Sequence, residues 1–514
     1  MKLNYKRTIL VGFAFFLISA FWQAYDATIP VILTNKFGMS QTWSGVIMAL
    51  DNVLAVFMLP LFGSLSDKCS GKHGKRTPFI TIGTTIAAVA LVALSFVDNA
   101  QLQNISAVSA IDDPAALEVI YDTEADKELM TPDGEKYILS EKFTKEAFME
   151  IRSTDTDEAT GVSLYTNYVV PARQAYAAQK TAESPATLIF FVALLLIVLV
   201  AMATFRSPAV ALMPDVTVKP LRSKGNAVIN LMGTAGGILV LVLGMVFATS
   251  AVRNSLMSYT TFYSVVAGIM LASLAIFLLT VRETVWAQQM REDSIKYGIE
   301  EEVKEDSGEK RSLTSGEKRS LIFILLSIAM WYFGYNAVTS KYSVYAGNIL
   351  QKDYNTTLLI AQAAAIISYL PAGQVASRIG RKKTILGGVV LLAVAFGSAS
   401  FMRANSPTWL MNVMFAAAGV AWATINVNSF PMVVEMCSGG DIGKYTGFYY
   451  TASMSAQIVT PMLSGLLMDS FGMTALVPYA AIFVVLAFVT MSMVKHGDAK
   501  VVAKKGLEAF DNDD

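Results

Sequence analysis

The feature that most constrains this chain is a series of twelve apolar segments, each long enough to cross a lipid bilayer as a helix. A helix needs about 20 consecutive, mostly apolar residues to span the hydrocarbon layer. Such segments occupy residues 8–34, 42–62, 78–97, 186–210, 225–249, 258–281, 319–342, 354–376, 384–402, 407–430, 444–467 and 473–494. Only 16% of the residues are charged and 54% are hydrophobic, so much of the surface must face lipid. The sequence therefore predicts an all-α membrane protein.

The distribution of Lys and Arg between the short loops predicts the orientation. Basic residues concentrate in loops on the cytoplasmic side of a membrane. If the N-terminus is inside, the inner loops hold clusters of bases, whereas the short outer loops hold only isolated ones such as Lys36, Arg253 and Arg403. Lys341, at the outer end of a span, is expected to extend toward the interface. We therefore predict a multi-pass protein of the cell (plasma) membrane with both termini in the cytoplasm.

The polar segments divide the spans into two sets of six. The predicted units are an N-terminal bundle of residues 1–97 and 185–281, an outer insertion at 98–184, an inner linker at 282–318, a C-terminal bundle at 319–496 and a cytoplasmic tail at 497–514. The insertion is acidic, with 17 Asp and Glu against 7 Lys and Arg. Its KELMTPDGEKYIL predicts a hairpin and its TKEAFMEI a short helix, so we expect a small extracellular α/β insertion. We favour a solvated cap over a specific binding module.

Two loops at corresponding positions of the halves share a pattern. Residues 60–80 read PLFGSLSDKCSGKHGKRTPFI, and residues 371–386 read PAGQVASRIGRKKTIL. Each has a proline, then a glycine, then a second glycine that is followed by bases. Secondary transporters are commonly built from such internal repeats, with the solute site between the repeats near the bilayer midplane.

The first of these loops resembles the signature of the major facilitator superfamily between helices two and three. SDKCSGKHGKRTPFI is similar to the sucrose-transporter branch and its relatives among the glycoside–pentoside–hexuronide symporters, as are RSPAVALMPDV and WATINVNSFPMVVEM. The resemblance implies twelve transmembrane helices in two pseudo-symmetric six-helix bundles and transport by alternating access. The acids that these relatives use for coupling fall at Leu199, Ala55 and Leu59, so coupling by those routes is not expected, least of all to sodium.

Charged residues at the inner helix ends form the predicted gate. Arg76 and Lys75 can pair with Asp215, and Asp67 lies near positive helix N-termini. Such pairs form when the inner side is closed and separate when it opens, so they would set the populations of the two states. The whole predicted gating set is Gly63, Asp67, Gly74, Lys75, Arg76, Asp215, Arg378, Gly380, Arg381 and Glu435. The alternative is that the bases only anchor the inner side.

Three charges lie deep in the first six spans. Placing a charged side chain in a membrane costs free energy, so by default such charges mark a pathway or a proton relay. The three are Asp26, Asp51 and Arg206. His73 and His496 both lie outside the apolar segments, so a carboxylate is the candidate proton carrier, with Arg206 as its counter-charge. The alternatives are a helix-packing hydrogen bond for the acids and a structural tie for Arg206. We expect no cofactor, and the proton as the coupling ion.

Polar and aromatic residues recur at mid-depth and suit a neutral sugar, whose hydroxyls need fixed donors and acceptors and whose apolar face packs on aromatic rings. The predicted substrate-binding set is Gln23, Tyr25, Asp26, Asp51, Asn52, Trp331, Tyr332, Asn336, Gln362, Trp422, Asn426 and Gln457, and the resemblance adds Asn428.

The predicted function is proton-coupled symport of a glycoside or disaccharide. An efflux antiporter for amphipathic compounds and a non-transporting sugar sensor remain alternatives on the same fold. We predict that the chain is not an enzyme, because the sequence has no nucleotide loop, metal cluster or nucleophile–base pair. The net charge of zero does not suggest nucleic acid as a partner. The expected partners are a small sugar and the lipid bilayer, with the protein as a monomer.

Overall fold

All twelve predicted spans form long helices in the computed structural model, which describes residues 3–69, 71, 74–218, 221–297, 313–434, 436 and 442–496. The N-terminal half contains α1 (Tyr5–Asn35), α2 (Gln41–Met48) continued by α3 (Leu50–Lys68), α4 (Thr77–Asn104), α9 (Ala186–Asp215), α10 (Arg222–Val246) and α11 (Thr260–Thr280). The C-terminal half contains α13 (Ser315–Tyr345), α14 (Tyr354–Ile379), α15 (Arg381–Ala399), α16 (Thr408–Val434), α17 (Ile442–Phe471) and α18 (Leu476–Ser492).

Length and hydropathy support a membrane-spanning role for these helices. Within the described part of the chain, ten helices are long and apolar enough to cross a bilayer, and the bent α14 makes an eleventh. The remaining helix, α17, has 30 residues and carries more polar side chains. Apolar side chains such as Phe57, Val246 and Leu279 are exposed on the outside of the molecule, as a lipid-facing surface requires.

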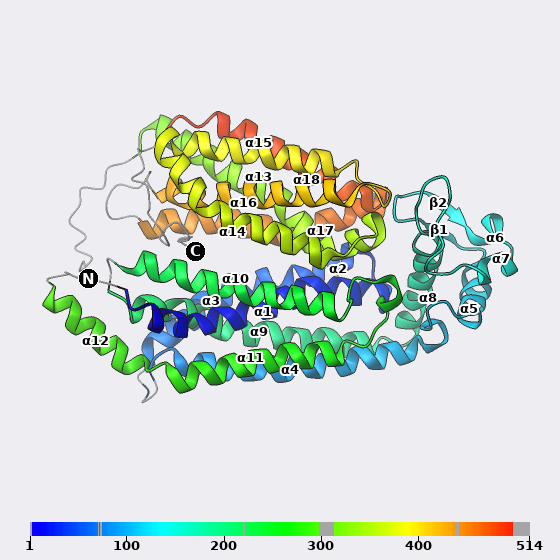
Figure 1. Cartoon of the computed structure of the whole chain (residues 1–514), viewed down its shortest axis with the longest axis horizontal. Helices are drawn as coiled ribbons and strands as arrows, with labels where there is room; N and C mark the ends of the chain where they lie inside the picture. Colours follow the sequence, from blue (N-terminus) through cyan, green and yellow to red (C-terminus); the bar gives the residue numbers. More distant parts are fainter. Residues whose placement is uncertain are drawn as a thin grey trace.

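The helices pack as two bodies with separate cores (Figure 1). One core is drawn from residues between Val11 and Trp286, and the other from residues between Leu321 and Val494 together with Ala27. Each half therefore packs largely on its own apolar side chains. Following the predicted orientation, we call the end at which α1 begins the inner end.

The predicted outer insertion folds as a separate lobe at the outer end (Figure 1). It contains α5 (Pro114–Glu124), β1 (Glu128–Met130), β2 (Lys136–Ile138), α6 (Leu139–Lys142), α7 (Lys145–Met149) and α8 (Val170–Glu183). The predicted hairpin and short helix are confirmed as β1–β2 and α7. Leu117, Phe148 and Tyr165 belong to its own buried core. The preceding helix extends to Asn104 rather than ending at 97, so we call residues 105–183 the cap.

Lys36 departs from its predicted place as an isolated charge in an outer loop. It is fully buried, with Nζ 2.7 Å from both carboxylate oxygens of Asp98, and it also donates to the carbonyl of Met257 at 2.7 Å. An ammonium group is tolerated in the interior only when a counter-charge and hydrogen bonds replace its water. This ion pair therefore ties the end of α1 to α4 and to the segment before α11.

The predicted flexible linker is in part a helix, α12 (Glu283–Lys296). Arg7 fixes it to the start of α1, because its guanidinium donates to Gln289 Oε1 at 2.5 Å and lies 5.2 Å from the ring centre of Trp286. The apolar Trp286 is buried, which holds the helix against the N-terminal half. Residues 298–312 and the predicted tail, 497–514, lie outside the described residues.

Candidate functional site

The deep charges of the N-terminal half form one group at mid-depth. Asp26 lies in the outer part of α1, and Asp51 lies in the first turn of α3, directly after the break in the helix at Ala49. Asp51 is within electrostatic range of both Asp26 and Arg206. Its Oδ1 accepts a hydrogen bond from Asn52 Nδ2 at 2.8 Å. The structure therefore brings together the three charges that the sequence singled out, from three different helices.

Asp26 lies at the end of an accessible stripe on α1. Phe15, Ser19, Trp22 and Gln23 are partly exposed and Asp26 is exposed, whereas every residue from Ala27 to Thr34 is buried. A spacing of three or four residues places the five accessible side chains on one face of the helix. Along this face the side chains are thus accessible as far as Asp26 and buried beyond it.

This face of α1 is turned toward the C-terminal half. Gln362 Nε2 on α14 donates to Gln23 Oε1 at 2.7 Å, across the boundary between the halves. The guanidinium of Arg206, from α9, lies 5.7 Å from the ring centre of Trp22. The acids, an arginine and a pair of amides are therefore gathered where the two halves meet.

The C-terminal half contributes a group of aromatic rings at similar depth. Tyr335 on α13 stacks on Trp422 of α16, with ring centres 3.6 Å apart and planes 5° from parallel. Tyr332 meets the same indole edge-on at 5.3 Å, and its hydroxyl lies 3.4 Å from that of Tyr449. Tyr335 was not in the predicted set. It lies one helical turn from Tyr332, and that spacing is the signal that could have found it.

Some predicted residues are partly exposed and others are not. Asn336, Gln457 and Asn426 are partly exposed, and the Nδ2 of Asn336 has no hydrogen-bond partner among the described residues. Tyr25 and Trp331 belong instead to the two buried cores. The next turn of α13 after Trp331 packs on α18, since a Cβ at Gly334 would lie 2.7 Å from the carbonyl of Ala480.

Asn428, which the resemblance had added, is also turned away from the accessible group. It is buried and donates to the carbonyl of Thr424 at 2.9 Å, within its own helix. This bond satisfies part of the amide within its own helix.

The outer end is closed by α2 of one half and α13 and α17 of the other. Asp469 accepts hydrogen bonds from the backbone N–H groups of Gln41 and Thr42, both at 2.8 Å, and from the Thr42 hydroxyl at 2.5 Å. Lys341 Nζ donates to the carbonyl of Gln41 at 2.6 Å. The prediction that Lys341 extends to the interface is wrong, because this side chain is fully buried, with Asp469 within electrostatic range.

Glycines make this approach of α2 to α17 possible. A Cβ at Gly45 would lie 2.0 Å from the carbonyl oxygen of Pro461, and one at Gly465 would lie 2.3 Å from that of Gln41. A second seam joins the outer ends of α10 and α14, where Ser250 donates to Asp353 at 2.7 Å and the Thr249 and Tyr354 hydroxyls lie 2.8 Å apart. We call the α2–α13–α17 contact the outer gate.

The predicted inner charges form a network inside the N-terminal half. Arg76 donates through Nε to Asp215 at 2.8 Å and through Nη2 to Asp67 at 2.5 Å, and it also bonds the Ser66 hydroxyl. Lys75 is exposed and contributes its backbone N–H to Glu283 instead of pairing with Asp215. A Cβ at Gly63 would lie 2.9 Å from Ser207 Oγ, so this glycine allows α3 to approach α9.

Glu283 is a member of this network that sequence reasoning missed. Its carboxylate accepts from the backbone N–H groups of Arg76 at 2.9 Å and Thr77 at 2.8 Å, and from the Thr77 hydroxyl at 2.7 Å. These donors are the free N–H groups at the start of α4, which attract a negative charge. Glu283 therefore connects α12 to the loop that carries Arg76.

The corresponding residues of the C-terminal half are arranged differently. Arg378 is exposed and Arg381 is partly buried, and Gly380 adopts φ +94° between α14 and α15. Lys382 donates to the carbonyls of Ser492 at 3.0 Å and Val494 at 2.5 Å, which ties this loop to the end of α18. Glu435 lies outside the described residues.

Replacing Gly74 with alanine is expected to disrupt the inner network. Gly74 has φ +105°, and a Cβ there would lie 2.2 Å from the carboxylate carbon of Glu283. The backbone strain alone costs about 1–3 kcal/mol, and the steric clash adds to it. We expect a lower thermal unfolding temperature in detergent. Gly71→Ala is the matched control, because the nearest atom to its Cβ would be 3.5 Å away. Equal unfolding temperatures for the two variants would contradict this assignment.

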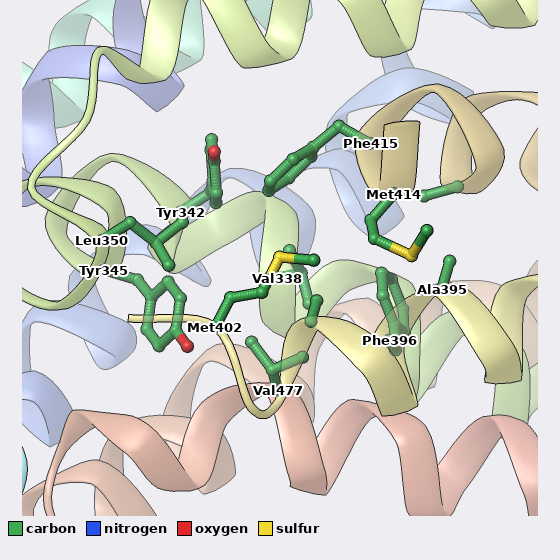
Figure 2. Close-up of a pocket in the computed structure, with 12 residues that line it drawn as sticks. Val338, Tyr342, Tyr345, Leu350, Ala395, Phe396, Met402, Met414, Phe415 and Val477 are labelled. Carbon is green, nitrogen blue, oxygen red and sulfur yellow. The ribbon is translucent and has the colours of Figure 1, made fainter. Parts of the chain in front are cut away.

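An apolar cavity inside the C-terminal half is a poor candidate for a solute site (Figure 2). It has a volume of about 20 Å³, which is room for one or two water molecules. Val338, Phe396 and Phe415 are among the apolar side chains that line it. The Tyr342 hydroxyl at its edge is already bonded to Thr357 at 2.5 Å. We interpret it as a packing gap between α13, α15 and α16.

Comparisons with known proteins agree with this architecture. Residues 10–108 match the family model described as MFS/sugar transport protein, and residues 348–509 match that of the Major Facilitator Superfamily. The chain is 30% identical over 74 residues to sucrose transport protein SUC4 of Arabidopsis thaliana, covering 14% of each chain. It is 23% identical over 144 residues to the MFS-type transporter ppzB of Metarhizium rileyi, covering 28% of this chain and 29% of that one. The matches thus span less than a third of these relatives.

Solved structures resemble the chain over nearly its whole length. The inward-open xylose transporter XylE from E. coli superposes with a TM-score of 0.57 at 15% identity, covering 99% of both chains. A D-xylose-proton symporter superposes with a TM-score of 0.56 at 16% identity, covering 95% of this chain and 97% of that one. A mutant form of the nucleoside transporter NupG superposes with a TM-score of 0.56 at 14% identity, covering 95% of this chain and 100% of that one. These likenesses show the fold, that of a multi-pass membrane protein with two helical halves. The two family-model matches confirm the resemblance to the major facilitator superfamily that the loop motif indicated.

Proposed function

We propose that this protein is a secondary transporter that moves a small neutral sugar by alternating access and couples its movement to protons. The observation that carries the proposal is the position of Asp26, an exposed carboxylate at the outer end of the accessible stripe on α1, which faces the C-terminal half. Asp51 and Arg206 interact electrostatically at the same depth. Charges in a membrane protein that face the boundary between two movable halves mark a solute or ion pathway.

The polar groups around Asp26 are suited to a sugar. Gln23 and Gln362 offer amide donors and acceptors where the halves meet, and carboxylates accept hydrogen bonds from pairs of hydroxyls. The stacked rings of Tyr335 and Trp422 offer an apolar surface for the C–H face of a pyranose. A pocket for amphipathic efflux substrates would be more uniformly apolar, so these groups favour a neutral sugar.

Coupling follows from the two states of a carboxylic acid. When protonated, Asp26 or Asp51 is neutral and can donate a hydrogen bond to a sugar hydroxyl. When ionised, Asp51 is attracted to Arg206, which favours release of the proton. A transporter that rearranges only with the acid neutral would carry one proton with each sugar.

The relatives support the choice of cargo and ion. Those with the most informative names are described as sucrose transport proteins and as a D-xylose-proton symporter. By analogy, we propose residence in the cell membrane, both termini in the cytoplasm and function as a monomer.

Sugar counterflow in proteoliposomes tests the proposal. Vesicles preloaded with an unlabelled neutral mono- or disaccharide should take up the same labelled sugar faster than empty vesicles. Saturable binding without counterflow would identify a sugar sensor instead. Absence of sugar binding together with extrusion of an amphipathic cation would identify an efflux antiporter.

A further inference from the structure

The cap is fixed to the N-terminal half. Gln174 Nε2 of α8 donates to Asn35 Oδ1 at the end of α1, at 2.8 Å. Gln101 Nε2 of α4 donates to the Thr181 hydroxyl at 3.0 Å. Gly38 follows α1 with φ +65°, and a Cβ there would lie 2.3 Å from the carbonyl oxygen of Gln174. With its own buried core as well, the cap must move as one body with this half.

The same cap also contacts the C-terminal half through the turn of its hairpin. The backbone N–H of Met473, between α17 and α18, donates to the carbonyl of Pro132 at 2.7 Å. The two backbones meet without room for side chains, since a Cβ at Gly134 would lie 2.5 Å from the Phe471 carbonyl oxygen and one at Gly472 would lie 2.5 Å from Gly134 N. Figure 1 shows β1 and β2 on the side of the cap nearest to this half.

A second contact joins another part of the cap to the segment between α13 and α14. The backbone N–H of Ser163 donates to Gln351 Oε1 at 3.1 Å. Gln351 has φ +52°, a conformation that costs a non-glycine residue energy and persists where its surroundings hold it. The cap therefore reaches the C-terminal half at two separate places.

The hairpin contact lies next to the outer gate. A cavity of about 210 Å³ separates the hairpin turn from the gate, and Thr131, Pro132 and Met473 line it together with Gln41 and Asp469. When the outer end opens, α17 must move away from α2. Because the cap is fixed to the half that carries α2, its contacts with Met473 and Gln351 must then break.

We propose that the cap is a latch, a docking surface for the segments before α14 and before α18 that stabilises the outward-closed state. The proposal rests on the proposed function, since it assumes that the halves alternate. Its energetic consequence is a shift in the populations of the two states, because an interaction made in only one state favours that state by its full free energy.

Cross-linking tests the latch. Both native cysteines are first removed by Cys69→Ser and Cys437→Ser. Two crossing pairs, each with one cysteine on the cap and one on the C-terminal half, are then introduced. The first is Asp133→Cys with Thr474→Cys, at positions where the Thr474 hydroxyl donates to the Asp133 carbonyl at 3.4 Å. The other is Ser163→Cys with Gln351→Cys. The matched control is Lys127→Cys with Gln179→Cys, which are bonded at 3.1 Å within the cap. A disulfide or a short bismaleimide across either crossing pair should lower sugar uptake by about tenfold or more, and the control link should leave it unchanged.

A readout that needs no sugar separates the latch from the proposed function. Ser44 is fully buried in the outer gate, so a Ser44→Cys thiol, added to each background, should react with an impermeant maleimide only when the gate opens. Cross-linking the crossing pairs should suppress this labelling, and reduction of the disulfide should restore it. If fully cross-linked protein shows the same Ser44→Cys labelling or the same sugar uptake as protein without cross-links, the latch proposal is wrong. If the protein without cross-links moves no sugar, but cross-linking still suppresses its Ser44→Cys labelling, the latch proposal is supported and the proposed cargo is wrong.

Discussion

Replacing Asp51 with asparagine is expected to abolish proton-driven accumulation of sugar while leaving exchange of sugar across the membrane. Asparagine keeps the size and hydrogen-bonding oxygen of the aspartate but cannot bind or release a proton. A carrier without its titratable group still equilibrates its cargo but gains no energy from the proton gradient. Accumulation above the external concentration should fall at least about tenfold, as for loss of an essential proton-transfer group, and exchange should become independent of pH.

Asp26→Asn belongs in the same experiment as the test of the other candidate carrier, because Asp26 lies within electrostatic range of Asp51. Glu128→Gln is the control, since this exposed side chain pairs only with Lys136 on the cap surface among the described residues. It should leave both accumulation and exchange unchanged. Accumulation that survives both Asp26→Asn and Asp51→Asn would remove these acids from the coupling mechanism.

The second large effect is expected at the outer gate. Asp469→Asn removes the carboxylate that accepts three hydrogen bonds from Gln41 and Thr42 and leaves the fully buried Lys341 without its nearby counter-charge. Each hydrogen bond to a charged group is worth about 1.5–3 kcal/mol. Because these contacts hold α2 to α17, the cost falls on the outward-closed state. External labelling of a Ser44→Cys thiol should therefore rise at least about tenfold.

A double variant distinguishes gating from general damage. Lys341→Met removes the buried ammonium, so Asp469→Asn should cost less in its presence than alone. Thermal unfolding in detergent provides the stability reference for each variant. If Asp469→Asn leaves labelling at the background level, or if the two substitutions add without any interaction, the gating role of this pair is wrong.

The arrangement of spans could be predicted because its cause is local. A run of about 20 apolar residues in lipid can satisfy all of its backbone hydrogen bonds within the segment only by forming a helix, and all twelve runs form helices. The hairpin was also predictable, since Pro132, Asp133 and Gly134 encode its turn. The pairing of Arg76 with Asp215 was predicted from the sequence, whereas the bond of Arg76 to Asp67 was not.

The parts that escaped prediction depend on contacts between distant segments. Glu283 bonds residues more than 200 positions earlier, and nothing in the polar stretch around it indicates that partner. Lys341 at a helix end has the pattern of an interfacial lysine, and only the position of α2 buries it. Trp331 could not be ranked from sequence, because a membrane helix is apolar all round and its periodicity does not reveal which face meets the other half.

The most direct test of the account is uptake of labelled neutral mono- and disaccharides into proteoliposomes, with the lumenal pH recorded at the same time. With an acidic exterior, at least one sugar should accumulate above its external concentration, the lumen should acidify in step with that sugar, and a protonophore should abolish the accumulation. Sugar entry that neither exceeds equilibrium nor moves protons, or the absence of entry for every sugar in the panel, would contradict the account.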